Sequence, residues 1–78
     1  MKRDFIINWF VDNSALTREQ IEADIDMNYL EKGVVDSFGF LGLIAACEEE
    51  LGVEFDDDDF ALDEIFTISG IINVIENK

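Results

Sequence analysis

The chain has 78 residues, which is enough for one domain with a marginal core, and we expect a single domain over residues 1–78. Nineteen Asp and Glu residues against five Lys and Arg residues give a formal net charge of −14, which argues against direct nucleic-acid binding because phosphates would be repelled. One Cys and no His exclude an internal disulfide and a Cys/His zinc site.

The apolar segments are too short for a membrane protein. No stretch approaches the ~20 consecutive apolar residues that cross a bilayer. The N-terminal run MKRDFIINWFVDN is interrupted by Asp4 and Asp12 and has no small-residue cleavage site, so a signal peptide is not expected. These features predict a cytoplasmic protein without membrane insertion, and we expect it to be a monomer.

Helices are favoured because the chain has no Pro, five Gly and 49% hydrophobic residues. The first helix is predicted over residues 4–12, with Asp4 as its N-cap and its end near residues 12–14. Four large side chains form its apolar stripe: Phe5, Ile6, Trp9 and Phe10. We interpret Trp9 and Phe10 as core residues in preference to a ligand-stacking pair.

Residues 14–36 form a long connection without sustained periodicity. The segment from Thr17 to Gln20 matches a capping box and predicts a short helical turn. Ile25 and Leu30 are expected to fasten the connection to the core. Gly33 is expected to adopt a positive φ just before the next helix.

A second main helix is predicted to begin at Asp36 and to stop at Gly52. Five residues at helical spacing form its apolar face: Phe40, Leu43, Ile44, Cys47 and Leu51. Cys47 is therefore expected to be an inert packing residue. The glutamates 48–50 crowd the C-terminal end, where the helix dipole disfavours negative charge. Their placement indicates either a partner-binding surface or plain solubility.

Four adjacent aspartates precede a short third helix, which we expect to include Phe60 and Leu62: Asp56, Asp57, Asp58 and Asp59. The run could weakly collect a divalent cation, but it lacks the alternating ligands, the glycine and the distal Glu of an EF-hand loop. A solvated turn whose last aspartates cap the short helix is therefore preferred. Thr67 is the predicted N-cap of the last helix, in which Gly70 would allow close packing. The predicted fold is all-α, a small four-helix bundle of three main helices and one short helix, with a long loop between the first two.

Catalysis by this chain alone is not expected, because a serine nucleophile needs a base and the chain has no His. Ser37 is more informative as a target of modification, since a helix N-terminus stabilises a phosphate. Asp36 would repel that phosphate and could instead hold a metal ion used by the modifying enzyme. On spacing alone, an equal alternative is that Ser37 is merely an N-cap and Asp36 an incidental turn residue.

The string GVVDSFGFLGLIAACEEELGVEF resembles the phosphopantetheine-attachment region of acyl and peptidyl carrier proteins. In that family a Gly-x-x-Asp-Ser-Leu/Phe motif opens the second helix, and an acidic Glu-Glu-Glu segment closes it. The resemblance extends over nearly the whole chain in length, acidity and helix order. It implies a carrier protein without enzymatic activity, which holds an acyl or aminoacyl group as a thioester on a phosphopantetheine arm derived from coenzyme A.

Residue by residue, the resemblance implies that Ser37 receives the phosphopantetheine and that Asp36 takes part in the magnesium-dependent transferase step. Partner enzymes would contact six positions of the second main helix: Phe38, Gly39, Leu41, Gly42, Glu48 and Glu49. The implied partners are a phosphopantetheinyl transferase, an acyl- or aminoacyl-loading ligase, and downstream acyltransferase or synthase enzymes with basic patches.

The chain departs from the housekeeping fatty-acid carriers, which it otherwise resembles, at Gly39 and Gly42, where those proteins carry acidic residues, and at Asp56, where a proline is common. Each of the two glycines costs ~1 kcal/mol of helix stability relative to Ala. We therefore expect a carrier of a specialised biosynthetic pathway whose partner approaches this helix closely. The alternative hypothesis is an acidic interaction module without the prosthetic group, which would have no use for Ser37.

Overall fold

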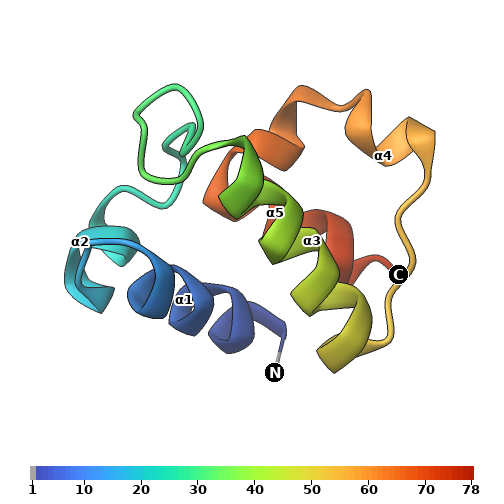
Figure 1. Ribbon diagram of the computed structural model, residues 1–78, viewed down its shortest axis with the longest axis horizontal. Coiled ribbons are helices and arrows are strands. Elements are labelled where there is room, and N and C mark those ends of the chain that lie inside the picture. The colour runs from blue at the N-terminus through green and yellow to red at the C-terminus, as the bar shows by residue number, and fades with distance from the viewer. Residues whose placement is uncertain (1) are drawn as a thin grey trace.

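The computed structural model describes residues 2–78, in which five α-helices and one 3₁₀-helix follow one another without a β-strand (Figure 1). In chain order these are α1 (Lys2–Asn13), α2 (Arg18–Ala23), α3 (Ser37–Leu51), α4 (Asp57–Phe60), η1 (Asp63–Phe66) and α5 (Ile68–Glu76). The predicted all-α fold with a long first connection is confirmed. The short helix α2 corresponds to the helical turn predicted at the capping box, and η1 was not predicted.

The core lies between the three longest helices. The C-terminal helix α5 packs against α1 and η1, while α3 crosses in front of α5 in Figure 1. These helices supply most of the buried apolar side chains: Ile6, Ile7 and Phe10 from α1, Leu43, Ile44 and Cys47 from α3, and Ile68, Ile71, Ile72, Val74 and Ile75 from α5. The apolar side chains that recur at helical spacing in the sequence therefore point into the core.

The first helix differs from its prediction at its start. It begins at Lys2, so Asp4 lies inside its first turn and is not the N-cap. The Asp4 carboxylate instead accepts a hydrogen bond from Arg18 of α2 at 2.9 Å. Trp9 is half-buried and packs edge-on against the buried Phe10 ring, with 5.1 Å between centroids. Trp9 therefore packs at the margin of the core and keeps part of its ring exposed.

The long connection is fastened at the predicted residues and at one that the sequence pattern did not single out. Ile25 and Leu30 are half-buried and pack against the core as predicted, and Met27 and Tyr29 are buried. The Tyr29 ring lies against Phe10, and its hydroxyl donates a hydrogen bond to the Ile65 carbonyl. A phenol can be buried in this way because its polar end has a partner. The capping box is confirmed at Thr17.

The segment before α5 corrects two further expectations. The first aspartate of the acidic run, Asp56, caps α4 by accepting from the Asp59 N–H, whereas the last aspartates were predicted to do so. Leu62 lies beyond the end of α4 and precedes η1. Thr67 is confirmed as the N-cap of α5. Gly70 is confirmed as a close-packing position, since a Cβ there would lie 1.7 Å from the Glu64 carbonyl oxygen.

None of the helices within residues 2–78 combines the length and the apolar character needed to cross a membrane.

Candidate functional site

The start of α3 is fixed by a capping interaction that does not involve the serine hydroxyl. Asp36 is the N-cap, in an extended conformation, and its Oδ1 accepts a hydrogen bond from the Gly39 N–H at 2.8 Å. Ser37 is the first residue of the helix and is exposed. The alternative in which Ser37 is merely the N-cap is therefore wrong, because Asp36 performs that role.

The backbone leading to Ser37 is held from the inside of the molecule. Gly33 has the expected positive φ of 69°, which turns the chain toward α3. The next residue, Val34, donates its N–H to the Tyr29 carbonyl at 2.9 Å, and Val35 is buried. The Tyr29 N–H in turn donates to the Phe66 carbonyl at 3.1 Å. The loop is thus bonded to the segment before α5, and this connection sets the position of the α3 N-terminus.

The three serines of the chain differ in how their hydroxyls are used. Ser14 donates to the Phe10 carbonyl, and Ser69 donates to the Asp26 carboxylate at 2.6 Å. Hydrogen bonding at the start of α3 within residues 2–78 engages the Asp36 carboxylate, which leaves the Ser37 hydroxyl without a described partner. Ser37 is therefore the serine whose oxygen has no structural task in the described chain.

Two large apolar side chains lie on α3 beside Ser37 and face solvent. Phe38 is 84% exposed and Leu41 is 62% exposed. Among residues 2–78, the other exposed large apolar side chains are less exposed: Phe60 at the end of α4 is 37% exposed, and Leu62 just after it is 45% exposed. The sequence prediction for this segment did not address their exposure. Exposed aromatic and leucine side chains next to a reactive group are typical of a surface that another protein covers.

The predicted partner-binding positions share the outward side of α3. Gly42 is exposed, and no described atom lies within 4 Å of the place that a Cβ would take there, whereas Gly39 is half-buried and its Cβ would meet the Val35 Cβ at 3.0 Å. Glu48 and Glu49 are exposed near the C-terminal end of the helix. The structure therefore brings Phe38, Leu41, Gly42, Glu48 and Glu49 to one solvent-facing side, with Gly39 at its edge.

The cationic residues of the chain are occupied elsewhere. Each Lys or Arg has a described partner: Lys2 donates to the Ile75 carbonyl, Arg3 and Arg18 pair with Glu22, Lys32 pairs with Asp24, and Lys78 pairs with Asp59. Within residues 2–78, no ion pair involves the three glutamates at the end of α3. The outward side of α3 therefore carries negative charge that the chain itself does not neutralise.

The acidic run of residues 56–59, at the start of α4, does not form a metal centre in the described part of the chain. The carboxylates of Asp56 and Asp59 each accept a hydrogen bond from the backbone N–H of the other, and Asp59 also contacts the Lys78 ammonium at 2.7 Å. The Lys78 hydrogen bond holds the pKa of the Asp59 carboxyl below its usual value. No group of three or more acidic or cysteine side chains within residues 2–78 is placed to hold a metal ion. Two of its aspartates, Asp56 and Asp59, therefore serve helix capping.

Cys47 is buried in the core, on the side of α3 opposite to the exposed residues. Burial, together with the neighbouring Glu48 carboxylate, raises the pKa of the Cys47 thiol to about 11. A protonated and enclosed thiol is a poor nucleophile. Cys47 therefore agrees with its predicted role as a packing residue.

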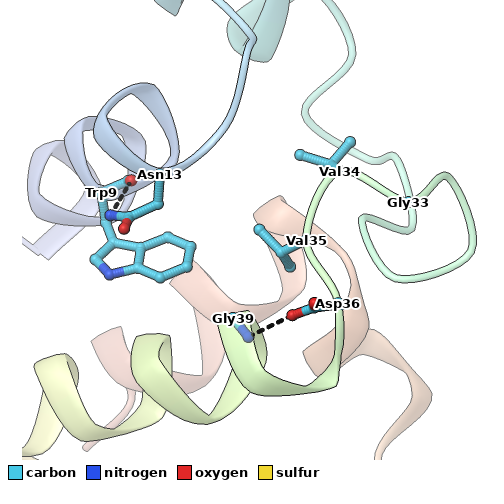
Figure 2. Close-up of a pocket in the computed structure, with 7 residues that line it drawn as sticks. All are labelled: Trp9, Asn13, Gly33, Val34, Val35, Asp36 and Gly39. Carbon is cyan, nitrogen blue, oxygen red and sulfur yellow. Dashed lines mark hydrogen bonds between the residues drawn. The ribbon is translucent and has the colours of Figure 1, made fainter.

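A hollow of about 330 Å³ lies on the other flank of the α3 N-terminus, between α1 and the loop (Figure 2). Its lining comes from Trp9, Asn13, Gly33, Val34, Val35, Asp36 and Gly39. Figure 2 shows the Trp9 indole extending from α1 toward Val35, with Asp36 and Gly39 on the far side. The hollow has no signature in the sequence, because it depends on how α1 meets the loop.

Residues 13–75 match the family described as the phosphopantetheine attachment site. The chain belongs to this family. It is also similar to D-alanyl carrier protein 1 of Lactiplantibacillus plantarum, with 31% identity over 62 residues that cover 80% of this chain and 78% of that protein. The expected resemblance to carrier proteins is thus confirmed. The protein is a carrier that holds an acyl or aminoacyl group on a covalently attached phosphopantetheine arm.

Proposed function

We propose that Ser37 is the residue to which the phosphopantetheine arm of this carrier is attached. The proposal is supported by the hydrogen bonding at the start of α3. Asp36 caps the helix and leaves the exposed Ser37 hydroxyl free. The bond that forms joins Ser37 Oγ to the phosphorus of the arm. The bond that breaks is the pyrophosphate bond of coenzyme A, and the adenosine bisphosphate portion leaves.

The helix N-terminus suits the phosphate that this bond places on Ser37. The first N–H groups of a helix have no intrahelical acceptor and carry partial positive charge. One of them, the Gly39 N–H, is already bonded to Asp36. The remaining free N–H groups of the first turn favour a phosphodiester at this position. Once attached, the arm supplies a thiol that holds the cargo as a thioester.

We assign Asp36 a second role beyond capping. Its Oδ1 is engaged by the Gly39 N–H, and the carboxylate remains exposed beside Ser37. A carboxylate in that position can contribute to the magnesium-dependent transfer by helping to hold the metal ion that the transferase uses. The chain provides no basic residue at this site, so the proton of Ser37 Oγ is removed by a group of the transferase.

The outward side of α3 is the surface by which we propose that partner enzymes recognise the carrier. Phe38 and Leu41 would enter apolar contacts close to the arm, and Glu48 and Glu49 would meet basic patches farther along the helix. Exposed charge of one sign speeds encounter with an oppositely charged partner and makes the encounter sensitive to salt. The partners we propose are a phosphopantetheinyl transferase, a loading ligase for the acyl or aminoacyl group, and downstream acyltransferases or synthases.

The finer points of the biological setting are also proposals. We propose a monomeric, cytoplasmic protein of one domain over residues 1–78, which catalyses no reaction of its own and serves a specialised pathway. The open surface at Gly42 supports a closely approaching partner. Similarity to a D-alanyl carrier protein supports aminoacyl groups among the candidate cargoes.

Intact-mass analysis tests the attachment residue. The protein is incubated with coenzyme A, magnesium and a broad-specificity phosphopantetheinyl transferase. The wild-type protein and Ser69→Ala are expected to gain the mass of one phosphopantetheine, whereas Ser37→Ala gains none. Ser69 is a suitable control because it also lies in the first turn of a helix. Loading of Ser37→Ala, or failure of the wild-type protein to load, would overturn the proposal.

A further inference from the structure

The hollow beside Trp9 combines three chemical features that together suit one kind of side chain. Its apolar lining comes from the side chains of Val34, Val35 and Trp9, and Figure 2 shows Val35 facing the Trp9 indole. A carboxylate, Asp36, lies at its far edge. A long side chain with an apolar stem and a cationic head is complementary to such a surface, because its stem covers apolar groups while its head stays at the polar rim.

Asn13 adds a hydrogen-bond acceptor to the rim. Its Nδ2 donates to the Trp9 carbonyl at 2.9 Å within α1, as Figure 2 shows. That bond fixes the amide, so the Oδ1 atom is left as its acceptor group. The other polar rim group, Asp36, uses one carboxylate oxygen for the Gly39 N–H and keeps further acceptor capacity. The rim therefore offers the oxygens of Asn13 and Asp36 as acceptors to a ligand, while the residues that line the hollow also include the indole N–H of Trp9 as a donor.

No cation of the chain competes for this place. None of the Lys and Arg residues described within residues 2–78 lines the hollow, and each is engaged with a carbonyl or carboxylate elsewhere. The negative charge at Asp36 is thus uncompensated in the isolated protein. The hollow and the net charge of −14 both favour a positively charged occupant.

Two other occupants fit less well. The arm would leave from Ser37, and Ser37 and Gly39 are separated by about 200° around the helix axis, so the arm starts on the opposite flank of α3. A second copy of this chain would bring a second net charge of −14 to the contact.

We propose that the hollow between α1 and the α3 N-terminus receives an arginine side chain from a partner protein. The guanidinium meets the Asp36 carboxylate in a charge-assisted hydrogen bond, and the stem lies across Val35 and the indole of Trp9. Arginine fits better than lysine because its planar head can form two parallel hydrogen bonds with a carboxylate. The inference rests on the proposed function in so far as the partner is an enzyme that approaches Ser37.

The proposal is tested by titrating ¹⁵N-labelled protein with N-acetyl-arginine methylamide while recording amide and indole resonances. The Trp9 indole N–H, the Asn13 side-chain amide and the Gly39 N–H are expected to shift together and to saturate. N-acetyl-citrulline methylamide has nearly the same shape without the charge, and we expect it to bind about tenfold more weakly. Shifts spread evenly over the acidic surface, or equal binding of the two probes, would overturn the proposal.

A matched pair of variants separates the hollow from general electrostatics. Asn13→Lys places a cation at the rim and is expected to weaken binding of the arginine probe by about tenfold. Asn73→Lys makes the same charge change at an exposed position of α5 and is expected to leave that binding unchanged. Equal effects of the two substitutions would contradict a defined site.

The same titration on phosphopantetheine-loaded protein tests whether the phosphopantetheine arm, instead of an arginine, occupies the hollow. Loaded protein is expected to bind the arginine probe as the unloaded protein does. Loss of probe binding after loading, with Trp9 shifted in the absence of probe, would assign the hollow to the arm and overturn the proposal. Because the probe experiment on unloaded protein requires no arm, its outcome is independent of whether Ser37 is the attachment residue.

Discussion

Asp36 and Ser37 are adjacent residues with separate physical tasks. The Asp36 carboxylate completes the hydrogen bonding of the α3 N-terminus, and the Ser37 hydroxyl faces solvent. A serine that also served as the cap would have to give up its hydrogen bond to be modified. The arrangement in the structure allows Ser37 to carry a phosphate without any loss of helix capping.

Substitution of Asp36 should distinguish its two roles. Asp36→Ala removes the cap and is expected to lower the free energy of unfolding by ~1 kcal/mol, measured by urea denaturation. Asp36→Asn retains a capping oxygen, so its stability should stay close to wild type, while loss of the charge should slow phosphopantetheine loading. Equal destabilisation by Ala and Asn would contradict the capping role, and unchanged loading of the Asn variant would contradict the role in transfer.

Cys47 and the arm thiol should differ sharply in reactivity. The raised pKa of Cys47, about 11, and its burial keep the thiol protonated and enclosed. Near pH 8, Ellman's reagent should therefore detect about one thiol in native loaded protein and about two in denaturant. The unloaded protein is the control, and it should show a reactive thiol only after unfolding. Rapid reaction of native unloaded protein would contradict the packing role.

Burial of Cys47 also makes the free energy of unfolding depend on pH in the alkaline range. Folding raises the pKa of the Cys47 thiol from its ordinary value of 9.0 to about 11, and burial also raises the pKa of Tyr29. For a group whose folded pKa is raised, the contribution to stability is complete below the unfolded pKa and is lost as pH rises through the folded one. The free energy of unfolding should therefore decrease above about pH 9. A flat urea midpoint across this alkaline range would contradict the burial of these groups.

At the scale of helices and loops, close contacts decide which residues can be substituted without loss of stability. Gly70 in α5 lies against the backbone of η1, and Gly42 in α3 faces open space. Both are helical glycines with the same intrinsic penalty, so their difference comes from packing. The position of Ser37 depends on similar contacts, because Tyr29 bonds the loop before α3 to the segment before α5.

The two glycines should respond in opposite directions to the same substitution. Gly42→Ala is expected to raise the free energy of unfolding by ~0.5–1 kcal/mol, since alanine has the higher helix propensity. Gly70→Ala would place its Cβ 1.7 Å from the Glu64 carbonyl oxygen, so it should destabilise the protein by at least ~2 kcal/mol. Urea denaturation of both variants measures the difference. A stabilised Gly70→Ala would show that η1 is not packed against α5.

At the scale of the whole molecule, charge is distributed unevenly. Three of the cations pair within α1, α2 and the loop, Lys78 pairs with Asp59 of α4, and Lys2 donates to the Ile75 carbonyl. The glutamates of α3 have no described partner. The net charge of −14 therefore acts on the fold as self-repulsion and on partners as attraction. The two effects share one origin, so conditions that screen the charge should stabilise the carrier and weaken its encounters.

Salt should reveal this self-repulsion. Raising NaCl from about 0.05 M to about 0.5 M shortens the screening length and is expected to raise Tm by about 5 °C. Calorimetry or circular dichroism measures the change. A variant with glutamates 48–50 replaced by glutamine should show a smaller salt effect. An unchanged Tm in the wild-type protein would show that repulsion does not limit stability.

The sequence alone determined the local features of the fold. Helical spacing placed Leu43, Ile44 and Cys47 on a buried face, and Gly33, Gly52 and Thr67 were identified as turn and cap positions because each has a local conformational preference. The motif around Ser37 also indicated the carrier family without any knowledge of the fold. These features depend on residues close together in the chain, so a pattern of neighbours is enough to predict them.

Only the tertiary structure decided how distant segments meet. Tyr29 binds the Ile65 carbonyl, Gly70 contacts Glu64, and Trp9 forms a hollow with the loop before α3, all through contacts that no local pattern specifies. The choice of Asp36 over Ser37 as the N-cap also required the three-dimensional structure, because both residue types cap helices well and lie side by side. The sequence motif identifies Ser37, and long-range packing determines its surroundings.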